Sequence, residues 1–220
     1  PDYGCSIGVV CLSISGTTVS QGTALMVQNN FYVPRSVSKI DSTRALLTYN
    51  GAGSVFSRVV SLSGTTLSLA PVITIPIYPY FTFNLSSTKA IGFGDNSAGN
   101  KGVANVFTIS GSGASSTVSR ASDSEWLSVV PYNEATTRAA QLDTDKFIIV
   151  YTKSGLAKIW AKIVTASGTT VSAGAEKVMV DYTADISSVS VTSATAGVLF
   201  FDDNGSPGTQ EHLTAQQFTV

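Results

Sequence analysis

The groups that could catalyse a reaction are few in this chain. It holds one histidine, His212, so a Ser–His–Asp site would depend on that residue, and no Gly-x-Ser-x-Gly turn accompanies it. Two carboxylates could hydrolyse a glycoside. Most of the 14 acidic residues, however, stand beside turn-forming residues, where Asp bonds the local backbone. The residue types therefore predict a protein that is not an enzyme, with a glycan-degrading enzyme as a remaining hypothesis.

Two short acidic segments carry oxygen ligands that would suit a calcium ion. They are Gly94–Asn100, which contains Asp95, and Asp202–Ser206, which contains Asp202 and Asp203. Neither segment has the full pattern of a calcium-binding loop, so ordinary turn chemistry is the alternative. Asp95, Asp202 and Asp203 are the candidate metal ligands, and Ca²⁺ is the one cofactor that the sequence suggests.

Aromatic side chains could bind a sugar, because Tyr and Trp combine a flat apolar face with a polar group. Trp160 alternates with Lys158 and Lys162, and this alternation predicts that its ring faces the core between neighbouring repeats. The aromatics of the less regular segments are better candidates for a ligand-binding surface. These candidates are Tyr78, Tyr80, Trp126 and Tyr132.

Hydroxyl groups, rather than charges, supply most of the polarity of this chain. Charged residues make up 12% of its 220 residues and the net charge is −1, whereas 31 serines and 25 threonines form about a quarter of it. No basic cluster offers the positive surface that nucleic acids require. No apolar run reaches the ~18 residues that a membrane-spanning helix needs. We therefore expect no nucleic-acid partner and no membrane insertion, and the composition is common among extracellular and virion proteins.

One hairpin sequence motif recurs along the chain and defines its repeats. Residues 10–20, 59–68 and 159–172 each contain an alternating strand, a Ser-Gly-Thr-Thr turn and a second strand, and residues 106–112 give a looser copy. Glycine adopts a positive φ without a Cβ clash, which suits a tight hairpin turn. The turn glycines, spaced about 50 residues apart, are Gly16, Gly64, Gly111 and Gly168.

Each repeat divides into four short strands. The second strand is an almost continuous apolar run, as in residues 44–49 and 146–151, which indicates burial on both faces. The repeats cover residues 1–31, 32–79, 80–132, 133–183 and 184–220. Four-stranded units of this period are typical of β-propeller blades. We therefore predict an all-β fold: one domain, residues 1–220, forming a β-propeller-like array of four-stranded antiparallel blades with about four repeats. It is either a ring that closes on itself or a fragment of a larger propeller.

Two segments fit this repeat less well. Residues 133–142 could form a helix with Asn133 as its N-cap, although the repeat register places a strand over the second half. The fourth strand of the third repeat, residues 117–130, is irregular around Glu125–Leu127. We expect strand in the first case and an interrupted strand in the second.

The segments 143–155 and 161–174 resemble the propeller-type repeats of tail fibres and other virion appendages in tailed bacteriophages. Read in succession, the two segments contain an apolar strand that ends in Tyr, a Gly-containing loop, an alternating strand and a Ser-Gly-Thr turn. The resemblance covers nearly the whole chain, but Asn50 and Lys153 stand near where Asp is usual. It implies a non-enzymatic structural or adhesive protein, located in the virion and involved in host attachment. Its partners would be other virion proteins or copies of itself, and its ligand a host-surface polysaccharide.

A secreted or cell-surface propeller lectin of a bacterium is the alternative hypothesis. Equivalent sugar pockets should then recur in every repeat, whereas the candidate aromatics do not recur at equivalent positions. The resemblance supplies no catalytic residues, and it leaves the ligand open.

Overall fold

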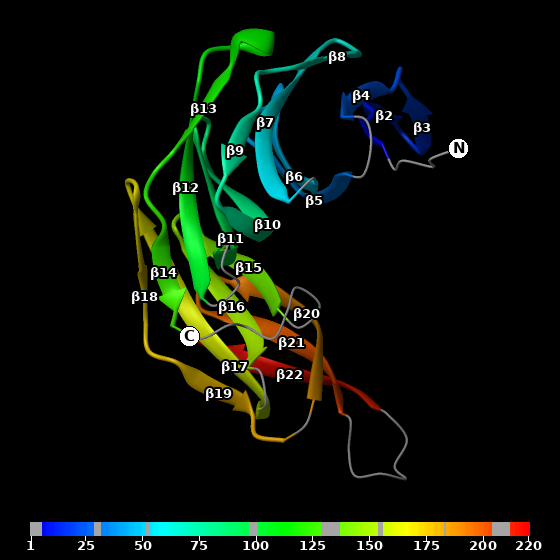
Figure 1. Cartoon of the computed structure of the whole chain (residues 1–220). Coiled ribbons are helices and arrows are strands. Elements are labelled where there is room, and N and C mark those ends of the chain that lie inside the picture. The colour runs from blue at the N-terminus through cyan, green and yellow to red at the C-terminus, as the bar shows by residue number, and fades with distance from the viewer. Residues whose placement is uncertain are drawn as a thin grey trace, which may run out of the picture. The chain divides into compact units, whose positions relative to one another are not determined.

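A computed structural model describes residues 6–28, 32–51, 53–96, 101–128, 137–153, 156–182, 184–203 and 212–220. Apart from one 3-10 turn, η1 (Gly113–Ser115), every regular element of these residues is a β-strand (Figure 1). Within the same ranges, no helix is long and apolar enough to cross a membrane. The predicted all-β fold is therefore confirmed.

The second repeat forms an antiparallel sheet with the strands in chain order, β5–β6–β7–β8, and with β9 pairing β7 on the same edge as β8. The bounds are β5 (Tyr32–Lys39), β6 (Arg44–Gly51), β7 (Ser54–Ser63), β8 (Thr66–Leu69) and β9 (Ile73–Ile75). The expected single fourth strand over residues 66–75 is thus divided. Pro71 lies in the break, and it has no N–H to continue the ladder.

The third and fourth repeats have the same strand order and the same divided fourth strand. Their bounds are β10 (Ile77–Ser86), β11 (Lys89–Asn96), β12 (Gly102–Ser110), β13 (Thr117–Arg120), β14 (Ser124–Leu127), β15 (Thr137–Asp143), β16 (Lys146–Lys153), β17 (Leu156–Ser167), β18 (Thr170–Ala173) and β19 (Lys177–Val180). Residues 137–142, a possible helix by sequence, are therefore strand. The segment 125–127 lies in β14, and its pairing with β12 has a register shift at Trp126, so the expected irregularity is present within a strand.

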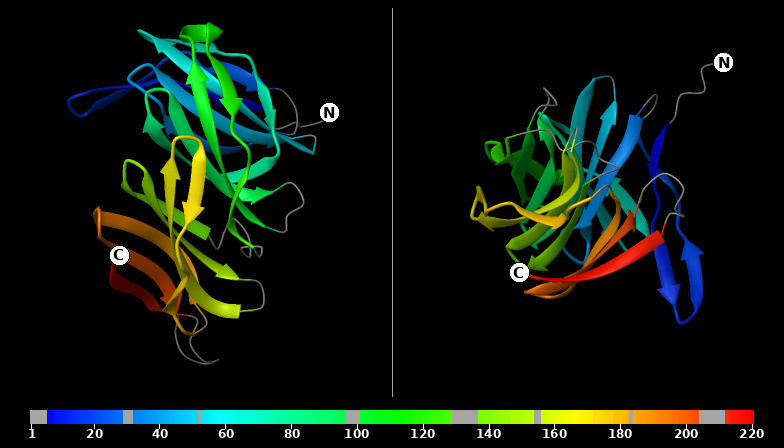
Figure 2. Two further views of the ribbon diagram at one scale, coloured as in Figure 1. Left: turned by 90° about the vertical axis from the view of Figure 1, so that its left-hand side faces the viewer. Right: turned by 90° about the horizontal axis from the view of Figure 1, so that it is seen from below.

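The first and last repeats are incomplete, and each forms its own smaller sheets. In the first, β1 pairs with β4 and β2 with β3, which correspond to the third and fourth strands of a complete repeat. In the last, β20, β21 and β22 lie side by side as the first three strands (Figure 2). The bounds are β1 (Ile7–Val9), β2 (Leu12–Ser15), β3 (Thr18–Gln21), β4 (Leu25–Gln28), β20 (Ala184–Ser193), β21 (Ala196–Asp203) and β22 (His212–Thr219).

Two backbone hydrogen bonds recur at equivalent places in different repeats. The first joins an N–H at the end of the third strand to a carbonyl in the turn between the first and second strands. It runs from Leu62 to Thr43, Ile109 to Thr88, Ala166 to Asp145 and Val220 to Thr195, at 2.7–2.8 Å. The second follows the hairpin and runs from Gly22 to Cys11, Ala70 to Val59 and Gly174 to Ile163, at 2.8–2.9 Å. The sequence repeat is therefore also a repeat of structure.

All four turn glycines have a positive φ: 59° at Gly16, 60° at Gly64, 75° at Gly111 and 65° at Gly168. An L-residue rarely adopts this region, because its Cβ approaches the following carbonyl oxygen. The third turn differs, because η1 follows Gly111 and a Cβ there would lie 2.7 Å from the Ser115 carbonyl oxygen. This extra turn explains why the third hairpin matches the others poorly in sequence.

The chain packs as two compact units. Unit 1 contains residues 1–92 and 107–121, and unit 2 contains residues 93–106 and 122–220. One core cluster of unit 1 combines Leu47, Tyr49 and Val60 with Ile7 and Val27 of the first repeat. A cluster of unit 2 is built around β16, β17, β21 and β22. In both units the second strand of a repeat is buried on both faces, as its apolar run predicted.

Successive repeats pack through their first strands. In unit 1, β5 lies beside β10, and the hydroxyls of Ser36 and Thr82 are 2.8 Å apart. In unit 2, β15 lies beside β20, and Arg138 Nε donates to the Ser187 carbonyl oxygen at 3.0 Å. The same lateral packing therefore occurs once in each unit.

Candidate functional site

The aromatic residues suggested by the sequence occupy different environments. Tyr78 and Tyr80 lie in β10 of unit 1 and are half-buried. Trp126 lies in β14 of unit 2 and is only 2% exposed, so its ring is not the exposed surface that the sequence suggested. Its ring packs against the Tyr151 ring. Tyr132 falls outside the described residues.

The suggested metal ligands lie in strands rather than in loops. Asp95 is in β11, and Asp202 and Asp203 are in β21, because each strand continues further than its apolar run. No group of three or more His, Cys, Asp or Glu side chains in the described parts of the chain could hold a metal ion. Residues 97–100 and 204–206, the rest of both segments, lie outside those parts, so cation binding by these segments stays a prediction.

A group of polar and aromatic side chains lies at one end of the sheet of the fourth repeat. We call it the polar–aromatic cluster, and it consists of Trp126, Tyr151, Lys153, Trp160 and Glu176. Tyr151 on β16 stands opposite Trp160 on β17. Trp126 packs edge-on against Tyr151, with ring centroids 5.4 Å apart and planes at 72°. All five residues belong to unit 2.

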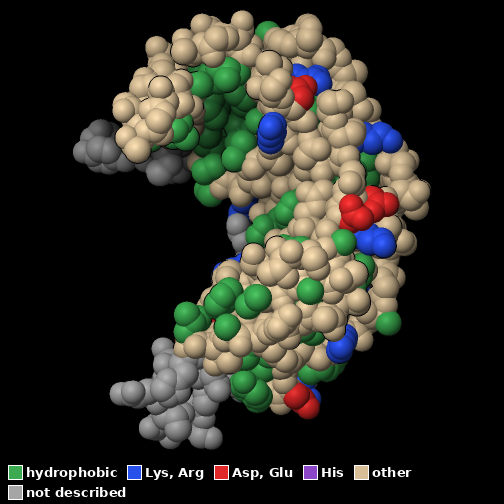
Figure 3. Space-filling view, turned by 180° about the vertical axis from the view of Figure 1, so that it is seen from behind, with side chains coloured by type: hydrophobic (Ala, Val, Ile, Leu, Met, Phe, Trp, Pro, Cys, Tyr) green, Lys and Arg blue, Asp and Glu red, His purple; other side chains and the backbone are tan. Residues whose placement is uncertain are grey.

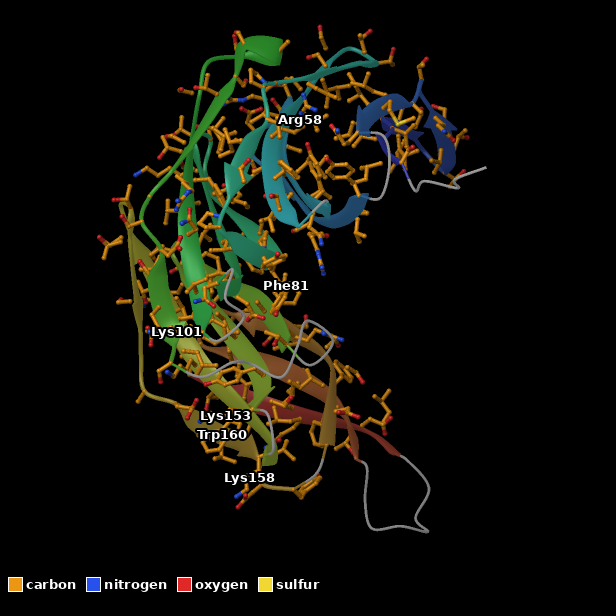
Figure 4. All side chains as sticks on the ribbon, viewed as in Figure 1. Arg58, Phe81, Lys101, Lys153, Lys158 and Trp160 are labelled. Atoms are coloured by element: carbon orange, nitrogen blue, oxygen red, sulfur yellow. The ribbon has the colours of Figure 1, made fainter. Side chains whose placement is uncertain are left out.

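Glu176 connects the polar members of the cluster. It lies between β18 and β19 and accepts hydrogen bonds from the Tyr151 hydroxyl and the Lys153 ammonium group. Lys153 Nζ also lies 4.0 Å from the centroid of the Trp160 ring, a cation–π contact. Figure 4 shows Lys153 and Trp160 together at this end of the sheet, with Lys158 nearby. The side chains of Lys153 and Glu176 are 18% and 22% exposed, so the pair can still be reached from solvent.

The electrostatics keep this site ionised. Burial raises the pKa of Glu176, but hydrogen bonds from Lys153 and Tyr151 and the charges of Lys153 and Lys162 outweigh it, so the pKa lies below its usual value. Burial, followed by the hydrogen bond to Glu176, raises the pKa of Tyr151, so the phenol stays protonated and donates. Glu176 is therefore a charged hydrogen-bond acceptor in the cluster, and Tyr151 is a neutral donor.

Two hydrogen-bond donors of the cluster are unused. The indole N–H groups of Trp126 and Trp160 are shielded from solvent and have no hydrogen-bond partner among the described residues. Buried polar groups are nearly always paired. A polyhydroxylated ligand would instead meet the partly exposed carboxylate of Glu176 and ammonium group of Lys153.

Comparison of equivalent positions in the second and fourth repeats shows which members of the cluster are specific to the fourth repeat. Tyr49 and Phe56 of the second repeat correspond to Tyr151 and Trp160, since each pair faces across its second and third strands. The last residue of β6 is Gly51, whereas the last residue of β16 is Lys153. Glu176 lies two residues after Gly174, whose N–H makes the recurrent backbone hydrogen bond. In the second repeat Ala70 makes the equivalent bond, and the residue two positions after it is Val72.

The charges at positions 153 and 176 are therefore not required by the repeat. Sequence reasoning missed both residues, because Lys153 was noted only as a departure from a usual Asp. Aligning the second and fourth repeats position by position would have found them.

A basic side chain at a recurrent position ties each of two repeats to the segment before it. Arg58 Nη1 donates to the Val27 carbonyl oxygen at 3.2 Å, and Lys162 Nζ donates to the Trp126 carbonyl oxygen at 3.1 Å. Both cations occupy the same place in the third strand, opposite the fourth residue of the second strand. Both hydrogen bonds stabilise the packing of neighbouring segments, and the bond from Lys162 also fixes β14, the strand that carries the Trp126 ring.

An apolar hollow of about 610 Å³ lies in unit 1, between the first repeat and the sheet of the second. Val9, Val37, Leu47, Val60 and Leu67 are among the residues that line it. The hydrophobic surface of this hollow is visible in Figure 3. It exists because the first repeat covers the second sheet with third- and fourth-strand segments only.

Asp41, Thr43 and Arg44 form the polar rim of the hollow. Burial raises the pKa of Asp41, but hydrogen bonds from Thr43 and the Arg44 guanidinium lower it to about 2. Arg44 also donates to the carbonyl oxygens of Ser87 and Gly111, both at 2.8 Å. The polar groups of Asp41, Thr43 and Arg44 therefore already make hydrogen bonds within the turn and to other segments. The polar–aromatic cluster is the better candidate site.

No known family model matches the sequence, and no curated protein is similar to it. The assignment of function therefore depends on the chemistry of the cluster and on the repeat architecture.

Proposed function

We propose that the chain is a non-enzymatic, β-propeller-type repeat module that binds a host-surface glycan at the polar–aromatic cluster. The observation that carries this proposal is that one repeat carries two charged residues, and a larger aromatic ring, where the second repeat has uncharged residues and a phenylalanine. Lys153, Trp160 and Glu176 stand where the second repeat has Gly51, Phe56 and Val72. A glycan would place its hydroxyls against the partly exposed Glu176 and Lys153, and its apolar face against the Trp160 ring.

The propeller assignment is supported by the strand order and by the lateral packing of first strands. Each complete repeat is a four-stranded antiparallel meander with a divided outer strand. Such units cannot bury their faces alone and must stack on their neighbours. The proposed role, a structural and adhesive part of a bacteriophage tail fibre or related virion appendage, is supported by the resemblance of segments 143–155 and 161–174 to those repeats. Low charge and Ser/Thr richness fit an extracellular location.

The binding proposal is tested with fluorescently labelled protein and a panel of purified lipopolysaccharides, capsular polysaccharides and teichoic acids. We expect saturable binding to at least one of them. Trp160→Phe and Glu176→Val restore the residues of the second repeat, and each should weaken binding at least about tenfold, the equivalent of ~1.4 kcal/mol. Tyr182→Ala, which removes an exposed aromatic residue outside the cluster, should leave binding unchanged.

Two results would contradict the proposal in different ways. Equal binding by wild type and all three variants would place the glycan elsewhere on the chain. Absence of binding to intact bacterial cells and to every polysaccharide would reduce the module to a structural spacer. Several equivalent sites per chain would favour the lectin alternative, because a repeated pocket would then exist.

A further inference from the structure

Lysines gather around Trp160 in a unit that has an excess of acidic residues. Unit 2 contains 12 Asp and Glu residues and 7 Lys and Arg residues. Three of these seven cations lie in or next to the polar–aromatic cluster: Lys153, Lys158 and Lys162. Positive charge is therefore concentrated at the cluster.

Two of these ammonium groups form ion pairs and remain accessible from solvent. Lys153 pairs with Glu176, and Lys158 pairs with Asp181. The side chains of Lys158 and Asp181 are 42% and 71% exposed, and an ion pair as exposed as this contributes little stability. An ammonium group has three N–H donors, so both lysines can bind a further acceptor.

The charges of this group do not cancel. Lys162 Nζ donates to an uncharged acceptor, the Trp126 carbonyl oxygen. The three lysines and the two carboxylates that pair with them therefore leave one positive charge. Salt confines the effect of exposed charges to roughly 8 Å at physiological ionic strength. The lysines in contact with a bound group therefore decide whether that group is attracted as an anion.

Two lysines flank the surface that a sugar ring would contact. Lys158 and Trp160 are two positions apart in β17, so their side chains leave the strand on the same face. Lys153, on β16, places its Nζ 4.0 Å from the centroid of the Trp160 ring. Figure 4 shows the three side chains together. A sugar ring against the indole therefore has two ammonium groups beside it, where an acidic substituent of the sugar would bind.

The third repeat shows that a lysine alone does not make this arrangement. Lys101 occupies the place of Lys158, since each precedes the residue that pairs with the end of its fourth strand. Lys101 also forms an ion pair, with Glu125 at 2.6 Å. Two positions further on, however, the third repeat has Val103 instead of a tryptophan. A lysine at this place is thus shared by two repeats, and its combination with Trp160 is specific to the fourth.

We propose that the glycan bound at the polar–aromatic cluster is acidic, and that its carboxylate or phosphate group binds the ammonium groups of Lys153 and Lys158. Both kinds of anion accept charge-assisted hydrogen bonds from ammonium donors. The acidic group replaces Asp181 as the partner of Lys158, while Glu176 keeps Lys153 in place at the indole. This inference rests on the proposed function, because it names the class of glycan that the same site binds.

The test compares charged and uncharged glycans by titration of the fluorescently labelled full chain. The probes are a glycerol-phosphate teichoic acid, a capsular polysaccharide that contains uronic acid, the same capsular polysaccharide after reduction of its carboxyl groups to alcohols, and a neutral O-antigen polysaccharide. At least one acidic probe should bind at least about tenfold more tightly than both uncharged probes. Binding of the teichoic acid alone would identify phosphate as the recognised group, and binding of the unreduced capsular polysaccharide alone would identify carboxylate.

Two variants of one ion pair have opposite expected effects. Lys158→Met removes an ammonium donor and should weaken binding of the acidic probe at least about tenfold. Asp181→Asn removes the competing carboxylate and should strengthen that binding about threefold. Lys101→Met is the matched control, because it removes the equivalent lysine of the third repeat, and it should leave binding unchanged. All three side chains are at least 42% exposed, so none of these changes should unfold the protein.

The possible failures of this inference and of the proposed function are distinguishable. Uncharged probes that bind as tightly as the acidic ones would overturn the inference and leave glycan binding intact. Equal losses of affinity in Lys158→Met and Lys101→Met would indicate a general effect of net charge and would also overturn it. Absence of binding to all four probes would contradict the proposed function and this inference together.

Discussion

Replacement of Gly168 by alanine measures how much the left-handed conformation of this turn residue affects the free energy of unfolding, because the change does not alter packing. Gly168 has a φ of 65°, and a Cβ built there meets no atom within 4 Å. The only cost is therefore that of holding an L-residue in the left-handed region, about 1–2 kcal/mol. For a chain of this size that loss corresponds to a melting temperature lower by about 2–8 °C.

Two other glycines provide matched comparisons. Gly111→Ala should cost more than Gly168→Ala, because a Cβ there would lie 2.7 Å from the Ser115 carbonyl oxygen in addition to the unfavourable φ of 75°. Gly174→Ala should change stability little or increase it by up to ~1 kcal/mol, because no positive φ is required and the nearest atom is at 3.5 Å. Gly168→Asn should lose less than Gly168→Ala, since Asn tolerates this region better.

The assay is thermal unfolding followed by circular dichroism, with the variants compared at one concentration and pH. The turn account requires the order Gly174→Ala, Gly168→Ala, Gly111→Ala from most to least stable. Equal melting temperatures for Gly168→Ala and Gly174→Ala would refute the reasoning that a left-handed residue closes the hairpin.

Three further predictions concern the hydrogen bonds of Arg58, the two carboxylates with a lowered pKa, and the hollow. Arg58→Met should lower the free energy of unfolding by about 1–3 kcal/mol, because three hydrogen bonds from a charged donor are lost; unchanged urea denaturation would contradict this. Glu176 and Asp41 both have a lower pKa in the folded state than when unfolded, so the stabilisation they give is complete above about pH 5 and is lost as the pH falls through the folded-state pKa, which is about 2 for Asp41. Glu176→Gln should therefore flatten the acid side of a plot of melting temperature against pH, and an unaltered plot would count against the coupling. Ala45→Leu should fill part of the hollow, raise stability by ~0.5–1 kcal/mol and reduce the fluorescence of a bound hydrophobic dye; unchanged dye binding would show that the hollow is not the dye site.

The strands were predictable because their side chains follow a simple period. The apolar runs 44–49 and 146–151 became β6 and β16, and the alternating segments after them became β7 and β17. The turn glycines were identified by type and spacing, and their positive φ follows from the hairpin geometry. Asp143 could be assigned to turn chemistry because it accepts a hydrogen bond from the backbone N–H of Thr144.

The division of the fourth strand could not be read from the apolar pattern. Residues 66–75 and 171–180 look continuous in sequence, but the chain leaves the ladder after the recurrent bonds at Ala70 and Gly174. The irregularity expected around Trp126 is present as a register shift between β12 and β14, but the ring is buried rather than exposed.

The candidate site was not predictable from sequence spacing. Lys153 and Glu176 lie 23 positions apart and meet only because β18 and β19 both fold back on β17. Trp160 was expected in the core between repeats, and its half-buried ring beneath Lys153 is only partly consistent with that expectation. Which side chains converge across a sheet depends on strand register, and register follows from pairing rather than from composition.

Tryptophan fluorescence tests glycan binding at the cluster most directly. The chain has two tryptophans, Trp126 and Trp160, and both belong to the polar–aromatic cluster. Titration with a polysaccharide that the labelled protein binds should change the emission saturably, with the same midpoint as the binding curve. In Glu176→Val the titration should require at least about tenfold more ligand. Binding that saturates with no change in tryptophan emission would contradict the account, because the glycan would then lie away from this cluster.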